Sequence, residues 1–294
     1  MGTEMRYYLA AFLKKVFFKI GKPRAFSHVS WAELLIYTVK QGVQLWQGPV
    51  RTCMASYRYV DECDAAITTP YGTLFVPRSL DITALRYLLR ETLDPHHWHH
   101  FDNHDTPITS GDVVVDCGAS EGLWALTIIN RVKKVYLVEP QDAFIRVLRK
   151  TFAPMLAAGV AEIIPYAIGA TDGTCTLVCN GDADVMASID PRRHGSVTLC
   201  RFDTLFAERR IDFIKADIEG AEMDLLQGAA ESIRRWQPKI AIAVYHPAND
   251  WKEMRDFIHS CDSSYAWKLT GMTAWGKPLM LHMWVPDRKK SHIP

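Results

Sequence analysis

The sequence lacks a surplus of either charge: 34 lysines and arginines oppose 33 aspartates and glutamates among 294 residues, a net charge of +1. Proteins that bind nucleic acid usually carry a basic surplus, so no nucleic-acid partner is expected. The seven cysteines form no CxxC pair, and an odd, scattered set favours free thiols in a reducing compartment over a disulfide framework. No internal repeat or low-complexity segment occurs. With 48% hydrophobic residues, the composition predicts a globular cytoplasmic protein.

The N-terminal segment lacks an apolar run long enough to span a membrane. Tyr8, Phe12, Val16 and Ile20 recur at helical spacing, but lysines interrupt them well before the ~20 apolar residues that a span needs. No small-residue cleavage site follows. A basic amphipathic helix can lie on an anionic membrane. We favour packing of residues 1–25 on the domain or on a partner subunit, which leaves membrane contact and a dimer as open alternatives.

The first third of the chain predicts helices and a hairpin. Ser30 and Glu33 form a capping box before a predicted helix. Residues 69–72, TPYG, are a turn signal between two strand-like runs, and a further helical pattern follows. We therefore expect a mainly helical extension over residues 1–65 and one domain over residues 66–294.

From residue 111 the chain alternates short apolar runs with helical patterns, and this stretch forms the core of the predicted domain. Strands are predicted at 112–117, 134–139, 161–166, 174–179, 211–217, 238–244, 264–270 and 279–285. Helices are predicted at 121–131, 141–153, 219–235 and 249–260. Buried strands that alternate with helices predict an α/β fold, a Rossmann-like, mostly parallel sheet with helices on both faces.

The loop after the first of these strands, in GDVVVDCGASEG at 111–122, carries the first chemical signal. Gly118 lets the backbone turn tightly, and Gly122 lets the following helix pack closely against whatever lies in the crevice. A dinucleotide fold uses GxGxxG because its backbone must approach a pyrophosphate. This loop has GxxxG, with Asp116 and Glu121 before and inside it. Negative charge there favours a cationic ligand, such as a sulfonium with an α-amino group.

The second strand ends at Glu139-Pro140. A carboxylate in this position can accept hydrogen bonds from both hydroxyls of a ribose. An ordinary surface glutamate is the alternative, and the preceding loop favours the ribose role.

The segment IDFIKADIEGAEMDLLQG at 211–228 places three acids after a buried strand. They are Asp217, Glu219 and Glu222, with Gly220 among them. The carboxyl ends of buried parallel strands are where open α/β sheets hold their ligands. The segment therefore predicts a polar site beside the glycine loop.

Together these motifs resemble the FkbM-type methyltransferases of the class I, Rossmann-like superfamily. The matching runs are GDVVVDCGASEGLWAL, YLVEP, IIPYAIGATDG, RFDTL, IDFIKADIEGAEMDLLQGA and PKIAIAVYH. The similarity spans roughly residues 66–285, and its most specific element is KxDxEGxE. It implies a seven-stranded sheet, S-adenosyl-L-methionine as methyl donor with S-adenosyl-L-homocysteine as product, and usually O-methylation of a hydroxyl on a sugar, glycan or secondary metabolite.

The resemblance also implies roles for single residues. The donor loop would comprise Asp116, Gly118, Ala119, Glu121 and Gly122, the ribose would meet Glu139 and Pro140, and adenine would lie against Ala167 and Ile168. Asp217 would sit near the methionine part of the donor or near the acceptor. The division of labour among Asp217, Glu219 and Glu222 stays open.

Methyl transfer to oxygen is an in-line displacement, so the protein has to position two reactants and remove a hydroxyl proton. Candidates for the base are Asp217, His246 and His282, and Glu219 is a further candidate catalytic residue. His246 follows the fifth strand and should project into the same crevice as the acids, where a carboxylate neighbour would raise its pKa. His282 lies inside a strand and is interpreted as structural. No metal ion is expected, although a divalent ion at Asp217 stays open.

The tract HHWHH at 96–100, with His104 nearby, resembles a metal-binding tract. Neighbouring histidines at a helix end point in different directions, and no Cys or acid lies at ligand spacing. We interpret the tract as a helix C-terminus and a loop, where cations are favoured, bordering the acceptor pocket.

Two other classes of function compete with a methyltransferase. A nucleotide-dependent oxidoreductase on a Rossmann-like sheet is disfavoured because the third fingerprint glycine is missing. A catalytically silent binding module is disfavoured because the acids listed above are all present. Sugar, polyketide and peptide acceptors all stay open.

Overall fold

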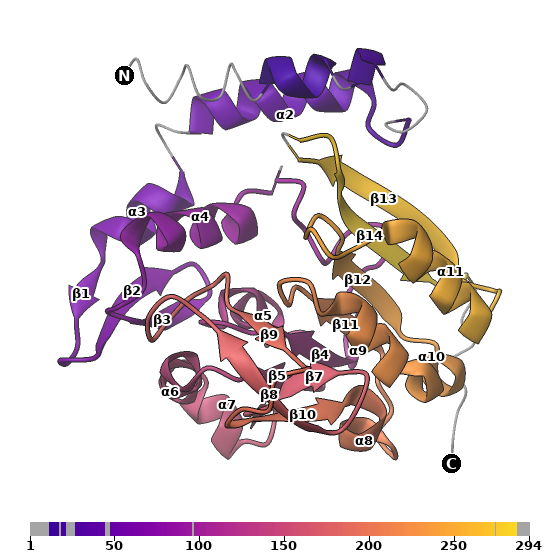
Figure 1. The fold of residues 1–294 in the computed structure, drawn as a ribbon. Helices are drawn as coiled ribbons and strands as arrows, with labels where there is room; N and C mark the ends of the chain where they lie inside the picture. The colour runs from indigo at the N-terminus through magenta and orange to yellow at the C-terminus, as the bar shows by residue number, and fades with distance from the viewer. Residues whose placement is uncertain are drawn as a thin grey trace.

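The computed structural model of this protein describes residues 12–17, 19–21, 27–44, 48–95, 97–273 and 275–286. Much of the helix predicted over residues 1–25 lies outside these ranges. In Figure 1 the strands extend from the lower middle of the molecule to its upper right, with helices beside them, and α2 (Trp31–Gln44) lies across the top.

The central sheet has seven strands in the order β13-β14-β12-β11-β4-β5-β6. Their bounds are β4 (Val113–Cys117), β5 (Lys134–Val138), β6 (Ala161–Ile164), β11 (Phe213–Ala216), β12 (Lys239–Ala243), β13 (Ala266–Met272) and β14 (Pro278–Trp284). Only β14 runs antiparallel to its neighbours, β12 and β13, among these described strands. The predicted mostly parallel, seven-stranded α/β sheet is confirmed.

Helices cover both faces of this sheet because successive strand residues point to opposite sides. Val114 belongs to one buried cluster together with residues of α5 and α6, whereas Val115 belongs to a second cluster together with residues of α8 to α11. The helices are α5 (Leu123–Ile128), α6 (Asp142–Thr151), α7 (Ala153–Ala157), α8 (Phe202–Phe206), α9 (Glu222–Gly228), α10 (Ala230–Trp236) and α11 (Trp251–Cys261).

A second sheet, not predicted from the sequence, lies between β6 and α8 in the chain. It contains β7 (Ala167–Gly169), β8 (Gly173–Val178), β9 (Ser188–Asp190) and β10 (Val197–Arg201), in the order β7-β10-β8-β9. Only the strand at 174–179 was expected. Three of these strands have five residues or fewer, too short for their pattern to be distinguished from a loop.

The helix predicted at 219–235 begins later than expected and is broken. Glu219 and Gly220 adopt positive φ angles of 55° and 107°, which are incompatible with a right-handed helix, so α9 begins only at Glu222. A second break separates α9 from α10 at Ala229. The turn before α9 sends the side chain of Glu219 toward the next strand's loop, which matters for the site described below.

The N-terminal part contains several elements, of which the last strand lies against α6 and the last helix against α5. They are α2, α3 (Pro49–Ala55), β1 (Arg58–Tyr59), β2 (Asp64–Thr69), β3 (Gly72–Pro77) and α4 (Ile82–Leu93). The predicted capping box is present: Ser30 N donates to Glu33 Oε2 at 2.6 Å, and Glu33 N donates to Ser30 Oγ at 3.0 Å. Phe12 and Val16 pack against a cluster that includes Met272 of β13.

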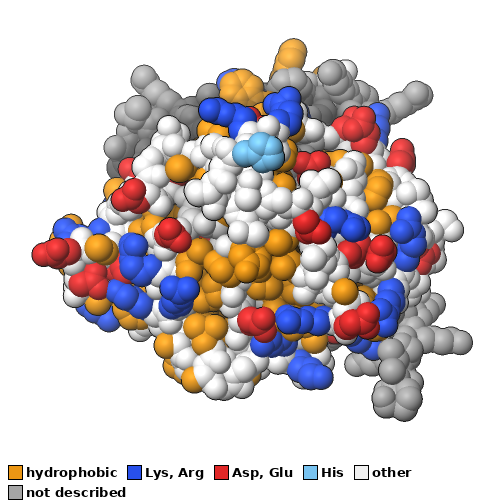
Figure 2. All heavy atoms as spheres, turned by 60° about the horizontal axis from the view of Figure 1, so that its bottom comes forward, with side chains coloured by type: hydrophobic (Ala, Val, Ile, Leu, Met, Phe, Trp, Pro, Cys, Tyr) orange, Lys and Arg blue, Asp and Glu red, His pale blue; other side chains and the backbone are white. Residues whose placement is uncertain are grey.

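The boundary predicted between residues 65 and 66 falls inside β2, which pairs with β3. No described helix is long and apolar enough to cross a membrane. All seven cysteines are free thiols, as the sequence predicted. On the face shown in Figure 2, acidic and basic side chains are interspersed around a central apolar area.

A buried carboxylate ties β2 to α6. Asp64 is fully buried, and its two oxygens lie 2.8 Å from Nη2 of Arg146 and 2.6 Å from Nζ of Lys150. Burial alone would raise the pKa of Asp64, but the two cations outweigh it and lower that pKa. The ion pairs of Asp64 therefore stabilise the folded protein fully at pH values above the unfolded-state pKa of about 4. This stabilisation is lost as the pH falls through the lower pKa of the folded state.

Substituting Asp64→Asn should lower the free energy of unfolding by about 1–3 kcal/mol at pH 7, because two cations lose a charged acceptor. Urea denaturation would measure this, and the difference from wild type should shrink in acid. Asp61→Asn is the matched control: Asp61 lies 2.6 Å from the same lysine but is exposed. Equal losses in the two variants would show that burial is not what makes Asp64 important.

Candidate functional site

The site lies where the strand order reverses. β4 and β11 are neighbours at the centre of the sheet, with β5 and β6 on one side and β12 on the other. Loops that leave the carboxyl ends of such central strands diverge and open a crevice. Gly118 follows β4, Glu139 follows β5, Asp217 follows β11, and His246 lies three residues past β12. The structure thus brings these four predicted residues to one edge of the sheet.

Two adjoining cavities occupy this edge. The first, which we call the donor cavity, is narrow and is lined by loop residues and by β7 and β9. Its walls include the predicted residues Gly118, Glu139, Pro140, Ala167, Ile168, Asp217 and Glu219. The second, the acceptor cavity, measures about 640 Å³ and shares Gly118, Ser120, Val185, Asp217 and Glu219 with the first.

Gly118 is required by close backbone packing. It has φ of 77°, and a Cβ atom there would lie 2.1 Å from the carbonyl oxygen of Asp217. Gly122 differs from its predicted role: its φ is 88°, but a Cβ atom would meet Leu148 and Phe152, so its close approach is to the core beside α6 and not to the crevice. Gly122 lines neither cavity.

Asp116 does not project freely into the donor loop. Its carboxylate pairs with Nζ of Lys215 at 2.8 Å, and both side chains are buried. Lys215 also donates to the carbonyl oxygen of Gly118 at 2.6 Å. Asp116 and its neighbours raise the pKa of Lys215 despite burial, so the lysine is a fixed positive charge beneath the loop. The pair therefore braces β4 against β11 at the bottom of the acceptor cavity, whose lining includes both residues.

Glu139 is 2% exposed and holds the donor loop in place. Its Oε2 accepts from the backbone N–H of Ser120 at 3.0 Å, and its Oε1 accepts from Gln141 N at 2.9 Å. Burial raises the pKa of Glu139 to about 7. Each carboxylate oxygen keeps a second lone pair for a ligand, so the two backbone contacts leave room for the predicted ribose contact.

The acceptor cavity has walls that lie outside the sequence motifs. α4 contributes Tyr87, Leu88 and Glu91, and the loop after it contributes His99 to Phe101. Glu121 lines the cavity from the other side, and burial raises its pKa to about 7. The volume lies within the ~300–1,000 Å³ that small-molecule sites usually offer.

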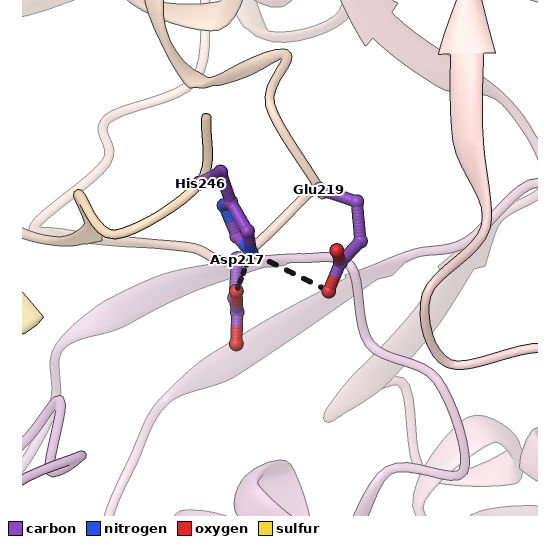
Figure 3. Close-up of side chains that lie close together, drawn as sticks. All are labelled: Asp217, Glu219 and His246. Atoms are coloured by element: carbon purple, nitrogen blue, oxygen red, sulfur yellow. Dashed lines mark ion pairs between the residues drawn. The ribbon is translucent and has the colours of Figure 1, made fainter. Parts of the chain in front are cut away.

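Three side chains converge where the two cavities meet (Figure 3). Nε2 of His246 lies 3.4 Å from Oε1 of Glu219 and 3.6 Å from Oδ1 of Asp217. The loop after β12 thus points its imidazole at the acids after β11, as predicted.

Glu222 contacts the other ring nitrogen of His246, Nδ1, and fixes the position of the imidazole. Its Oε1 lies 2.8 Å from Nδ1 of the imidazole, and Glu222 is fully buried. The same carboxylate accepts from Ile218 N, Gly220 N and Asn249 Nδ2 at 2.7–2.9 Å. Burial lowers the pKa of His246, but the surrounding carboxylates, Glu219 and Glu222 foremost, outweigh it and raise that pKa to about 10. The direction of this shift agrees with the prediction.

The histidine tract contributes one side chain that was not predicted. His99 is 5% exposed and lies with Nε2 3.5 Å from Oδ2 of Asp217 and with Nδ1 3.5 Å from Glu91. The loop borders the acceptor cavity, as expected, and His99 of this loop contacts Asp217. His96 lies outside the described residues, and His97 is buried against Tyr37 and His99.

His282 lies outside the site. It is fully buried in β14, with Nδ1 2.8 Å from the hydroxyl of Thr106 and Nε2 3.0 Å from Nδ2 of Asn103. Burial lowers its pKa to about 3. The structure places it among hydrogen-bonding partners away from both cavities, in keeping with its interpretation as structural.

Comparison with known proteins identifies the family. A model of the methyltransferase FkbM domain matches residues 116–265. No curated protein matches the sequence. Among solved structures, the chain is similar to methyltransferase FkbM from Methylobacillus flagellatus KT, at 21% identity and a TM-score of 0.48. That likeness covers 70% of this chain and 56% of the other, so this chain spans little more than half of that relative.

Two further structures are more distant. A putative methyltransferase from Streptococcus mutans in complex with SAH has 11% identity and a TM-score of 0.38, over 60% of this chain and 90% of that one. Fibrillarin from Aeropyrum pernix, with natively bound S-adenosyl-L-methionine, has 12% identity and a TM-score of 0.35, over 78% of this chain and 97% of that one.

The chain belongs to the FkbM methyltransferase family, because the family model covers half of its length. Its domain is a methyltransferase domain with S-adenosyl-L-methionine as cofactor, and this favours a methyltransferase over the oxidoreductase alternative. The residues fit this cofactor: a glycine turn that admits no Cβ, a buried carboxylate with spare lone pairs, and the apolar wall of Ile168 all face the donor cavity.

Proposed function

We propose that this protein transfers the methyl group of S-adenosyl-L-methionine to a hydroxyl oxygen of a small-molecule or glycan acceptor, such as a sugar or a secondary metabolite. The observation that carries the proposal is the meeting of the two cavities at Asp217 and Glu219, which line both. A donor in one cavity and an acceptor in the other would react across this boundary.

The donor is assigned to the narrow cavity because its lining matches the parts of that molecule. Glu139 offers acceptor oxygens for a ribose. Ala167 and Ile168, both buried in β7, offer an apolar surface for adenine. S-adenosyl-L-methionine supplies the methyl group when bound, and the chain's own residues position it.

The acceptor is assigned to the larger cavity. Its boundary with the donor cavity carries the carboxylates of Asp217 and Glu219 and the imidazole of His246. Methylation of a hydroxyl oxygen requires a group that takes the hydroxyl proton, and a nearby positive charge eases that deprotonation. Asp217 and Glu219 can take a proton, and a protonated His246 supplies positive charge. His246 is the alternative base, and the variants His246→Ala and Asp217→Asn distinguish the two.

Titration calorimetry with S-adenosyl-L-homocysteine and, separately, with NAD tests the donor assignment. Binding of the first and not of the second is expected. Incubating the protein with methyl-deuterated donor and a panel of sugars, polyketides and peptides, followed by mass spectrometry, tests the acceptor. A label found on nitrogen or carbon would overturn O-methylation, and NAD binding without S-adenosyl-L-homocysteine binding would overturn the donor.

A further inference from the structure

The three side chains of Figure 3 have the spacing of ligands around one metal ion. Two ligand atoms on a tetrahedral ion with bonds of ~2.1 Å lie ~3.4 Å apart. The distances from Nε2 of His246 are 3.4 Å to Glu219 and 3.6 Å to Asp217, and one ligand atom from each of the three residues lies within 4.8 Å of the others. An ion at their centre would need only small shifts of the side chains.

The imidazole itself gives independent evidence, because it is buried and its free nitrogen is aimed into this space. His246 is 3% exposed, and among the described residues Nε2 has no hydrogen-bond partner. Oδ1 of Asp217, which faces it, is also buried and without one. Buried polar atoms are nearly always satisfied in native proteins, so such a pair calls for a ligand.

The groups behind the cluster have the arrangement seen at metal centres. A metal-binding histidine almost always gives its second ring N–H to a carboxylate, a backbone carbonyl or a water molecule, which fixes the tautomer and the ring. Glu222 does this at 2.8 Å from Nδ1, and three further donors fix Glu222 in turn. On the far side, His99 lies 3.5 Å from Oδ2 of Asp217 and steadies the second oxygen of that carboxylate.

We propose that Asp217, Glu219 and His246 bind one divalent transition-metal ion at the boundary of the two cavities. One imidazole and two carboxylates form a mixed nitrogen and oxygen set, which suits Mn²⁺, Fe²⁺ or Zn²⁺ better than Ca²⁺ or Mg²⁺, whose preferred ligands are oxygens alone. Three protein ligands leave coordination positions open, and these face the acceptor cavity, whose lining includes all three residues.

The proposal deepens the proposed function and rests on it for the role of the ion. Open positions on the ion would hold the acceptor's hydroxyl, and an acceptor with a second oxygen on the adjacent carbon would chelate it. The substrate class is therefore a vicinal diol or an α-hydroxy carbonyl compound. With the ion bound, the Nε2 lone pair of His246 is used, so proton removal falls to a carboxylate oxygen that the ion leaves free, such as Oδ2 of Asp217.

The test measures metal binding without donor or acceptor, so that it stands apart from methyl transfer. Wild-type protein stripped with EDTA is titrated with Mn²⁺ and followed by electron paramagnetic resonance, and bound Zn²⁺ is counted by elemental analysis after dialysis. One ion per chain is expected. Glu219→Gln and His246→Ala should each weaken Mn²⁺ binding at least about tenfold, and Glu222→Gln should weaken it ~10–100-fold through the imidazole.

His104→Ala is the matched control, because His104 lies 3.8 Å from Asp105 but is fully exposed. It should bind Mn²⁺ as the wild type does. Circular dichroism checks that each variant is folded, and Glu219→Gln, at a partly exposed position, serves if His246→Ala does not fold. A wild type that binds neither ion, or a folded Glu219→Gln that binds Mn²⁺ with unchanged affinity, overturns the proposal. Binding of S-adenosyl-L-homocysteine by the stripped protein would then show that the proposed function survives.

Discussion

Replacing His246 with alanine is expected to lower turnover ~10²–10⁴-fold while the affinity for S-adenosyl-L-homocysteine stays nearly unchanged. The reason is that the imidazole lies among the carboxylates at the boundary of the cavities but is absent from the lining of the donor cavity. Single-turnover assays with labelled donor give the rate, and calorimetry gives the affinity. An active His246→Ala variant would transfer the chemistry to Asp217.

The pH profile then separates a base from a positioning residue. If His246 takes the hydroxyl proton, the wild-type rate should rise as the imidazole loses its own proton, up to about pH 10, because the carboxylates raise its pKa to about that value. The His246→Ala variant should not show this rise in rate with pH. If Asp217 takes the proton, a rise in rate set by this carboxyl group, whose pKa burial raises, should persist in His246→Ala.

The Asp217→Asn variant complements His246→Ala. It keeps the shape of the side chain but removes its charge from the wall common to both cavities. Loss of both donor affinity and rate is expected if Asp217 orients donor and acceptor together. A loss of rate alone would confine Asp217 to the acceptor side.

Replacing Glu139 with alanine is expected to raise the dissociation constant of S-adenosyl-L-homocysteine ~10–150-fold. Charge-assisted hydrogen bonds of ~1.5–3 kcal/mol would be lost with the carboxylate. The structure gives a second reason for weaker binding. Glu139 also accepts a hydrogen bond from the backbone N–H of Ser120 and so holds in place the loop after β4, which lines the donor cavity. Calorimetry measures the affinity, and thermal unfolding checks the fold.

Asp142→Ala is the matched control for this prediction. Asp142 is an exposed carboxylate three residues further along, at the start of α6, and it does not line the donor cavity. Its removal should leave the affinity unchanged. Unchanged affinity in Glu139→Ala would remove that residue from the ribose, and equal weakening in both variants would indicate a general effect of negative charge.

Sequence reasoning predicted the central sheet because its strands are buried and bounded by clear turn signals. It also predicted that Glu139, Asp217 and His246 lie at one edge of the sheet, since parallel strands direct their carboxyl ends to the same side. It missed the partners of these residues. The pairing of Asp116 with Lys215 joins positions 99 residues apart in the chain, and local patterns carry no information about such contacts.

The same limit explains why the contacts of His99 and Gly122 were not predicted. The histidine tract was recognised, but its contact with Asp217 depends on how α4 and the following loop fold over the sheet. Gly122 was assigned to the crevice by its place in the motif, whereas its surroundings are set by Leu148 and Phe152 of the neighbouring helix region. Glu222 belonged to the recognised motif, yet only the tertiary structure shows that its carboxylate holds His246.

The acceptor cavity is lined by residues from inside and from outside the segment that matches the family model. Asp217, Glu219 and His246 lie within the segment that matches the family model, residues 116–265, whereas Tyr87, Glu91 and His99 on the opposite wall precede it. We expect that exchanging residues 81–101 for those of another family member would change which acceptor is methylated and leave the affinity for S-adenosyl-L-homocysteine unchanged, because none of these residues lines the donor cavity.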